Sequence, residues 1–267
     1  MLLAIDIGNT TIGFAVIHKT GRIESSAVID TDAKIDKIKA VIDKILKGQV
    51  ISRAIICSVV PKVSKTLEDI LKKSVAVDII GRDIIVPIKN RYKNPKQVGQ
   101  DRLVGAYGAM KIYGCPLIVV DLGTAITFDV VSAQGDYLGG TIVPGLRLSA
   151  ESLFLKTALL PHIEIQAPRH IIGKTTQESI LSGLFYGYGS LCRGVIDLIS
   201  RQMKAKPKVV MTGGHTRLMK KFISPKIRKP HNRHSRPRQK HSGVNSSGNL
   251  IIDEDLVYKG IYFLSHS

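Results

Sequence analysis

The chain has 267 residues, a formal net charge of +18 and 44% hydrophobic residues. This length suits one large domain or two smaller ones, and the hydrophobic content is too high for a disordered chain. No apolar run is long enough for a membrane-spanning helix, and the N-terminus lacks the pattern of a signal peptide. Three widely spaced cysteines fit a reduced protein, so we expect a cytoplasmic protein with no membrane partner.

The positive charge is concentrated near the C-terminus. Residues 217–241 hold ten Lys or Arg and no Asp or Glu, and the other 242 residues carry a net charge of only +8. A strongly basic chain suggests a nucleic-acid partner, but most of this excess belongs to one segment. From residue 225 to 249 the segment has almost no apolar periodicity and no aromatic residue. We expect a mobile surface insertion there, with contact to nucleic acid or another polyanion as the less favoured alternative.

The hydrophobic pattern predicts short strands alternating with amphipathic helices. In the first half, a buried strand at 2–5 and its hairpin partner at 11–17 precede a helix at 33–47. A strand at 53–60, a helix at 61–73 and a helix at 99–113 follow. The second half is predicted to contain a strand at 117–120, a helix at 146–155, a long helix at 176–203 and a strand at 208–211, before a final strand or turn and a helix within 250–265.

Residues 117–131 resemble residues 2–17. Both segments run from an apolar strand through Asp, an apolar residue and Gly into a turn that contains Thr, and then into a second strand. A separation of 115 residues is too long for a solenoid repeat, so we expect a duplicated α/β half. The predicted halves are 1–115 and 116–267, and the insertion at about 225–249 lies in the second.

Two Asp-containing turns and a Gly-Gly turn are candidate phosphate sites. Asp6 precedes residues 8–11, GNTT, and Asp121 precedes Gly123, Thr124 and Thr127. A carboxylate at a strand end can hold a hydrated cation, and small residues let backbone N–H groups approach phosphate oxygens. Gly213-Gly214 follows a predicted strand and offers a third close approach. An ordinary hairpin turn is the alternative for each of them alone.

Asp101 and Arg102 form the clearest candidate acid–base pair. In phosphoryl transfer a carboxylate can accept the proton of the attacking hydroxyl, while an Arg can bind the substrate or the charge that builds on the phosphoryl group. The alternative is an ordinary helix start, where Asp is favoured by the helix dipole.

The chain resembles the type III pantothenate kinases. The motifs that carry the resemblance occur in the family's order: DIGNT (6–10), YKNPKQVGQDR (92–102), DLGTAITFD (121–129), GGTIVPG (139–145), TTQESILSG (175–183) and TGG (212–214). The resemblance covers residues 1–215 and resumes near 250–264. It implies an α/β fold with two ribonuclease-H-like halves, as in actin-like ATPases, and a nucleotide cleft between them. It also implies ATP-dependent phosphorylation of pantothenate to 4′-phosphopantothenate, the first step of coenzyme A biosynthesis.

The resemblance also implies roles for individual residues. Asp101 would be the catalytic proton acceptor. The ATP-binding positions would be Asp6, Ile7, Gly8, Asn9, Thr10, Thr11, Ile12, Gly13 and Thr124. The pantothenate-binding positions would be Tyr92, Gly99, Gln100, Asp101, Arg102 and Thr176. Asp6 would place Mg²⁺, and Asp121 would bind a monovalent cation, K⁺ or NH₄⁺.

The family resemblance implies a homodimer in which the partner completes the substrate site. The chain departs from the family pattern at 215–249. In the family a short connection stands at this place, whereas this chain has the basic insertion. Two alternatives remain at this point. One is a kinase of the same superfamily for another small hydroxylated substrate, and the other is a non-catalytic regulatory protein that binds nucleic acid through the basic stretch.

Overall fold

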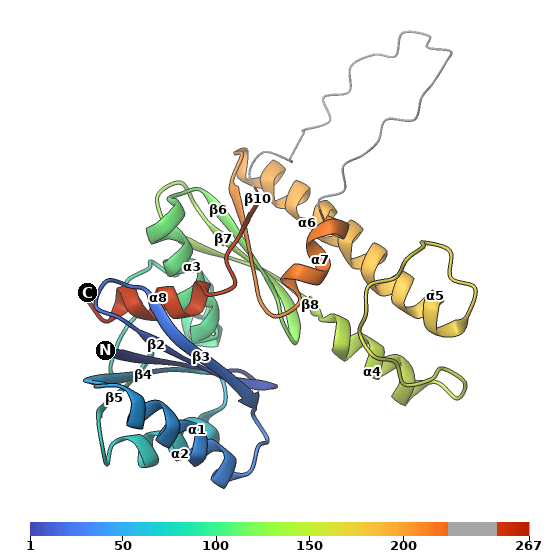
Figure 1. The fold of residues 1–267 in the computed structure, drawn as a ribbon. Coiled ribbons are helices and arrows are strands. Elements are labelled where there is room, and N and C mark those ends of the chain that lie inside the picture. The colour runs from blue at the N-terminus through green and yellow to red at the C-terminus, as the bar shows by residue number, and fades with distance from the viewer. Residues whose placement is uncertain (224–249, 267) are drawn as a thin grey trace.

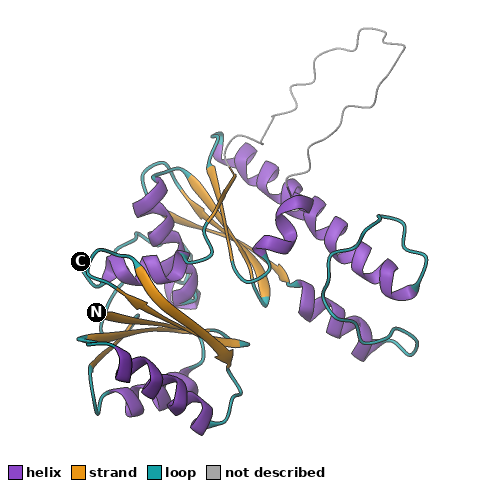
Figure 2. Cartoon of the chain, in the orientation of Figure 1, coloured by secondary structure: helices purple, strands orange, loops and turns teal. Residues whose placement is uncertain are grey.

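A computed structural model describes residues 1–223 and 250–266 (Figure 1). It confirms the α/β class, with two five-stranded mixed sheets and helices around and between them (Figures 1 and 2). The predicted insertion at 225–249, with all of its Lys and Arg, lies outside the described residues. In the part of the chain that the structure describes, no helix is long and apolar enough to cross a membrane.

The first sheet is formed by the N-terminal residues, with strand order β3-β2-β1-β4-β5. Its strands are β1 (Leu2–Ile7), β2 (Thr11–Ile17), β3 (Ile23–Asp30), β4 (Arg53–Ser58) and β5 (Ala76–Ile79). One face is covered by α1 (Ile35–Gly48) and α2 (Pro61–Leu71), which begins with Pro at its first turn. Ile38 and Ile42 of α1 are buried here, because the helical spacing of the isoleucines gives α1 one apolar face.

The second sheet repeats the topology of the first. Its strands are β6 (Leu117–Leu122), β7 (Ala125–Val131), β8 (Tyr137–Pro144), β9 (Lys208–Thr212) and β10 (Leu250–Ile252). Their order, β10-β9-β6-β7-β8, is that of the first sheet read from the opposite edge. Both second strands also shift register near their ends, at Val16/Ile17 and Val130/Val131. The duplication expected from residues 2–17 and 117–131 is therefore present in the topology.

Two helices at equivalent places in the repeat form a central layer between the sheets (Figure 1). They are α3 (Gln100–Tyr113), which follows the first sheet, and α8 (Leu256–Leu264), which follows the second. The helices pack closely because both have Gly where they cross. A Cβ on Gly108 would lie 3.0 Å from the Cα of Gly260, and a Cβ on Gly260 would lie 2.4 Å from the carbonyl oxygen of Val104.

The outer helices of the second half are α4 (Leu146–Lys156), α5 (Thr176–Ser182), α6 (Tyr188–Met203) and α7 (Thr216–Ile223). The long helix predicted at 176–203 is present as α5 and α6 joined by a π-helical turn, Gly183–Gly187. Glycines inside a helix favour either close approach to another helix or subunit, or a break in the helix. Gly189 allows such an approach within the chain, since its Cβ would lie 2.5 Å from the carbonyl oxygen of Phe222 in α7. Gly183, Gly187 and Gly194 face open space within this chain.

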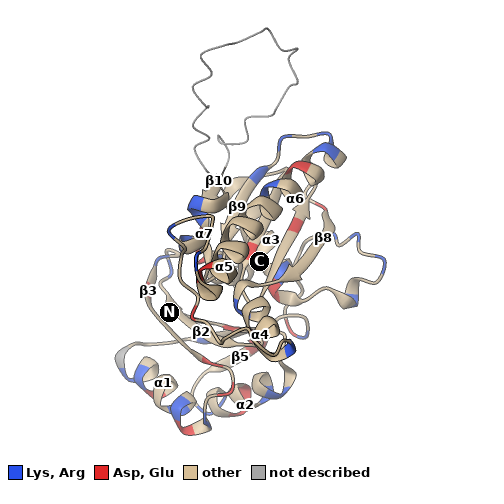
Figure 3. Cartoon of the chain, turned by 90° about the vertical axis from the view of Figure 1, so that its right-hand side faces the viewer, with Lys and Arg blue, Asp and Glu red and all other residues tan. Residues whose placement is uncertain are grey.

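Several elements differ from the sequence-based expectation. Strands β3 and β5 were not predicted, and the Gly-rich segment at 135–145 contains β8. These strands have weak apolar patterns because they form the edges or outer parts of the sheets. Helix α7 occupies the start of the basic stretch and buries Met219, Phe222 and Ile223. In the view of Figure 3, Lys and Arg are spread over several elements, including α1 and α7.

Candidate active site

Side chains alternate between the two faces of a strand, and this alternation places both candidate aspartates on the faces that point to the central layer. In β1, Leu3 and Ile5 pack toward α1 and α2, whereas Leu2 and Ala4 pack toward α3 and α8. Since alternate strand residues share a face, Asp6 lies on the α3 and α8 side. In β6, Leu117 and Val119 face the same central layer, and Asp121 therefore does too. The repeat thus brings two carboxylates from opposite sheets toward one region.

The two predicted phosphate turns face each other. The Oγ1 atoms of Thr10 and Thr124 are 2.8 Å apart, although 114 residues separate them in sequence. The first turn is closed by a hydrogen bond of 2.9 Å from the N–H of Gly8 to the carbonyl of Thr11. Beneath the second turn, a Cβ on Gly145 would lie 2.4 Å from the carbonyl oxygen of Thr124. The two turns therefore face each other through the hydroxyl groups of Thr10 and Thr124.

The Gly-Gly turn lies against the second aspartate. Gly213 has a positive φ of 91°, and a Cβ there would lie 2.2 Å from Oδ1 of Asp121. The next residue but one, His215, donates its backbone N–H to the carbonyl of Leu122 at 3.1 Å. The Gly-Gly turn is therefore adjacent to the turn that follows Asp121. Only Gly fits at 213, because of its positive φ and this close contact.

Within the expected ATP-binding segment, Gly13 also has a close neighbour. It pairs with Asp6 across the hairpin, and a Cβ on Gly13 would lie 2.0 Å from the hydroxyl oxygen of Tyr258 in α8. Ile7 and Ile12 are buried core residues, whereas Asn9 and Thr11 are exposed. The core residues hold the hairpin in place, and the polar residues of the turn are accessible to a ligand.

Asp101 lies in the first turn of α3, close to both strand-end aspartates. Burial raises the pKa of its carboxyl group, the hydrogen bond from the backbone N–H of Arg102 (2.8 Å) opposes the rise, and the charge of Asp129 adds to it. Gly99 leaves room for this carboxylate, because a Cβ there would lie 2.4 Å from Oδ1 of Asp101. Such a carboxylate is a stronger base than a solvent-exposed one, which suits proton abstraction.

Arg102 points from α3 to the second sheet. Its Nε donates to Oδ1 of Asp129 at 2.8 Å, and this pair is largely withdrawn from solvent, with side chains 11% and 3% exposed. Burial works against the charge of Arg102, but Asp129, together with Tyr137 and Tyr92, raises the pKa of the guanidinium overall. Arg102 is therefore a fixed positive charge beside the candidate base.

The remaining expected substrate residues fall into two groups. Tyr92 packs against β8, where a Cβ on Gly139 would lie 3.2 Å from its ring, and Gln100 packs against Gly81. Thr176 is exposed at the start of α5, which lies far from α3 in Figure 1. One chain therefore brings Tyr92, Gln100, Asp101 and Arg102 together but leaves Thr176 apart.

The strand-end aspartates suit a cation. Burial raises the pKa of Asp6 to about 7, and the charges of Asp101 and Asp121 add to the rise. Burial likewise raises the pKa of Asp121 to about 7, helped by Asp101 and Asp129. A bound cation would relieve this repulsion and favour the ionised forms. The described residues include no group of three or more His, Cys, Asp or Glu able to cage a metal. Mg²⁺ keeps several waters and binds one or two carboxylates together with substrate phosphates, so the carboxylate of Asp6 suits this ion.

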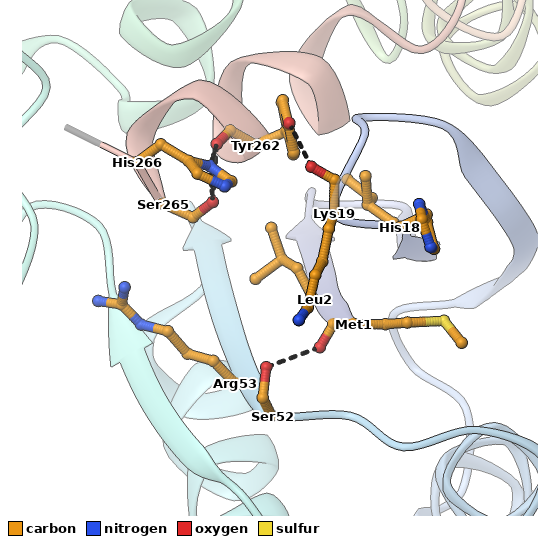
Figure 4. Close-up of a pocket in the computed structure, with 10 residues that line it drawn as sticks. Met1, Leu2, His18, Lys19, Ser52, Arg53, Tyr262, Ser265 and His266 are labelled. Carbon is orange, nitrogen blue, oxygen red and sulfur yellow. Dashed lines mark hydrogen bonds between the residues drawn. The ribbon is translucent and has the colours of Figure 1, made fainter.

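A pocket of about 300 Å³ lies elsewhere, at the amino-terminal ends of β1 and β4 and the end of α8 (Figure 4). Met1, Ser52, Arg53, Tyr262 and His266 are among the residues that line it. It is separated from Asp6 by most of β1, roughly 13 Å along the strand. This pocket is therefore distinct from the site that the motifs predict.

Sequence reasoning missed several residues that contact the site. Tyr258 lies against Gly13, and Gly145 lies against the second turn. Asp129 accepts hydrogen bonds from both Arg102 and Tyr137. Asp129 ends the DLGTAITFD motif and lies two residues after Thr127. Residues two apart on a strand share a face, so the pattern could have placed Asp129 on the same side as Thr127. No local pattern marks Tyr258, which reaches Gly13 only through the packing of α8.

Comparison with known proteins agrees with the motifs. Residues 2–198 match the family model of type III pantothenate kinases. The chain is 44% identical over 231 residues to a type III pantothenate kinase of Persephonella marina, covering 84% of this chain and 91% of that protein. It is 37% identical to another from a Sulfurihydrogenibium species, with 99% of both chains covered.

Solved structures share the fold at low sequence identity. A conserved putative Baf family transcriptional activator of Campylobacter jejuni has a TM-score of 0.58 at 18% identity, covering 99% of this chain and 97% of that one. A ROK family glucokinase of Streptomyces griseus, solved with glucose and AMPPNP, has a TM-score of 0.53 at 12% identity, covering 99% and 98%. At these identities the likeness concerns the two-domain, actin-like fold alone.

Proposed function

This chain belongs to the type III pantothenate kinase family, and we propose that it phosphorylates pantothenate with ATP to give 4′-phosphopantothenate in coenzyme A biosynthesis. One observation carries the proposal for this chain's own residues. The Thr10–Thr124 contact brings the two phosphate turns together, on the side of the sheets where Asp6, Asp121 and Asp101 interact electrostatically. A nucleotide held between the turns would have its terminal phosphate near Asp101.

The proposed mechanism gives each charged residue a separate task. Asp101 accepts the proton of the pantothenate hydroxyl as that oxygen attacks the γ-phosphoryl group, and the γ-phosphoryl bond to ADP breaks. Arg102 contributes a fixed positive charge for a substrate anion. The raised pKa of Asp101 supports its role as base, since a base with a higher pKa accepts a proton more readily.

Cations complete the proposed charge balance. Asp6 would hold Mg²⁺ with the phosphates of ATP, and Asp121 would hold a monovalent cation, K⁺ or NH₄⁺. These ions would offset phosphate charge and the repulsion between the carboxylates. The closeness of Gly213 supports a cation contact at Asp121, because a Cβ at 213 would lie 2.2 Å from Oδ1 of Asp121 and its absence leaves that oxygen free for an ion.

We further propose a homodimer that shares the substrate site. Large apolar side chains are exposed along α4 and the segment before α5, including Leu155 (71%), Leu159 (91%) and Ile172 (79%). Three glycines of the following helical segment also face open space. Such a surface is typical of an interface, and a partner chain could bring its Thr176 to the site that this chain leaves without it.

The alternatives are not favoured. A regulatory nucleic-acid-binding protein would have no need of a buried base and two facing phosphate turns.

A cytoplasmic location is proposed from the substrates and from the family.

The direct test is a kinase assay. Purified protein with ATP, Mg²⁺, K⁺ and pantothenate is expected to form 4′-phosphopantothenate, detected by mass spectrometry. Omitting K⁺ and then supplying NH₄⁺ tests the monovalent cation. Absence of product from folded protein under all these conditions would overturn the proposed function.

A further inference from the structure

We propose that Asp129 is a positioning residue for the reaction, which holds the guanidinium of Arg102 toward the substrate through a buried hydrogen-bond network across the two halves. This inference rests on the proposed kinase function. It assigns a task to a carboxylate that neither accepts the substrate proton nor holds a cation in that mechanism.

Asp129 accepts three hydrogen bonds in this network. Its Oδ1 accepts from Nε of Arg102 at 2.8 Å and from the hydroxyl of Tyr137 at 2.7 Å, and its Oδ2 accepts from Oγ1 of Thr127 at 2.9 Å. The side chain of Asp129 is 3% exposed, and Tyr137 is fully buried. Since both oxygens already accept hydrogen bonds from buried or half-buried protein donors, the carboxylate of Asp129 is well placed to fix the position of Arg102.

The network joins parts of the chain that come from different halves. Arg102 is in α3, which follows the first sheet, whereas Thr127, Asp129 and Tyr137 belong to β7 and β8 of the second. Both strands are held in register, with Asp129 opposite Gly140. A long Arg side chain has many rotamers, and fixing its Nε to a rigid strand removes most of this freedom before substrate arrives.

The attachment leaves donors of Arg102 for a ligand. Nη2 lies 2.7 Å from the same Oδ1 and is buried in the ion pair, whereas Nη1 has no hydrogen-bond partner among the described residues. An anionic oxygen of the substrate can accept a charge-assisted hydrogen bond from Nη1, and such bonds are stronger than those between neutral groups. Arg102 adjoins Asp101, and the same anchor therefore fixes the positive charge beside the base.

The test is a double-mutant cycle on kcat/KM for pantothenate. Asp129→Asn keeps the shape but removes the charge that anchors Arg102, and a loss of about 10²-fold is expected from misplacing the guanidinium. In an Arg102→Lys background, which lacks the guanidinium fork, Asp129→Asn is expected to cost less than about threefold, because the residues act as a unit. The affinity for an ATP analogue and the unfolding temperature report on folding in every variant.

The matched control is Asp78→Asn, which breaks another Asp–Arg pair, with Arg53 at 2.5 Å, in the first sheet. It is expected to leave kcat/KM within about threefold of wild type, because it makes no contact with Arg102. If Asp129→Asn does not fold, Tyr137→Phe replaces it in the cycle. That variant retains the ion pair, loses one anchor of Asp129, and is expected to cost about tenfold only when Arg102 is present.

Equal losses in both backgrounds, or near-normal activity of Asp129→Asn, would overturn the positioning role. These outcomes are distinct from failure of the proposed function. An inactive wild-type protein would refute the kinase proposal, whereas an active wild type with additive variants would refute only this inference.

Discussion

At the residue scale, the site derives its chemistry from burial of charge. Asp101 is held by a local hydrogen bond at the start of α3, yet burial outweighs that bond and raises the pKa of its carboxyl group. Arg102, its neighbour in sequence, remains charged because Asp129 compensates for burial. Asp101 and Arg102 are therefore adjacent residues of opposite charge at the start of one helix, and each has its own hydrogen-bond partner.

Asp101→Asn tests the proposed base. The substitution preserves size and removes the proton acceptor, so kcat is expected to fall about 10²- to 10⁴-fold. Binding of an ATP analogue, measured by calorimetry, is expected to change little, because the phosphate turns remain intact. Near-normal turnover would remove Asp101 from this role.

The pH profile tests the same residue independently. A base must be ionised, so kcat/KM is expected to rise with pH through the pKa of Asp101 and to level off above it. Because burial raises that pKa, the acidic limb is expected at a higher pH than for a solvent-exposed Asp. A steady-state profile over a range in which unfolding controls show the protein to be folded gives the midpoint. A midpoint at or below the usual Asp value would contradict the assignment.

At the element scale, the central helix pair joins the two halves. Helix α8 packs on α3 and β1, so a C-terminal segment completes the surroundings of an N-terminal strand. The division into 1–115 and 116–267 stays a prediction. The two sheets agree with it, while α8 lies between them.

Gly260→Ala tests this crossing. The new Cβ would lie 2.4 Å from a backbone oxygen of α3, so the helices must separate, with an expected loss of about 1–3 kcal/mol in the free energy of unfolding. Gly105→Ala is the matched control, because its Cβ meets no atom within 4 Å, and Ala favours a helix by about 1 kcal/mol. Urea denaturation should therefore give opposite signs for the two variants. Equal effects would show that the close approach does not limit stability.

At the scale of the whole molecule, the proposed dimer accounts for apolar surface that one chain leaves open. The exposed residues of α4 and of the segment before α5 lie in the part of the chain that extends away from α3 (Figure 1). The same part includes Thr176, which one chain separates from the other expected substrate residues.

Leu155→Glu combined with Ile172→Glu tests the dimer. Burying charges in an apolar interface is unfavourable, so the variant is expected to be monomeric by sedimentation velocity and to lose most pantothenate kinase activity. The control Val50→Glu changes another exposed apolar residue, 85% exposed and remote in sequence, and should remain dimeric. A monomeric wild type, or a monomeric variant with full activity, would contradict the shared site.

The sequence by itself determined the repeat, the order of the motifs and the α/β class. Buried strands have continuous apolar runs, and their Gly- and Thr-containing turns are local features, so residues 2–17 and 117–131 show them directly. It also singled out Asp101 and Arg102, which lie together at one helix start. Strands β3 and β5 were missed, since weakly patterned edge strands depend on their neighbours for pairing.

Only the tertiary structure decided which of these parts meet. The Thr10–Thr124 contact, the α3–α8 crossing and the anchoring of Arg102 by Asp129 join residues that are distant in sequence or on different elements. Such contacts depend on which face of each strand is buried and on how two sheets pack around one helix pair. No local pattern encodes that packing, whereas charge and apolar periodicity are properties of each segment alone.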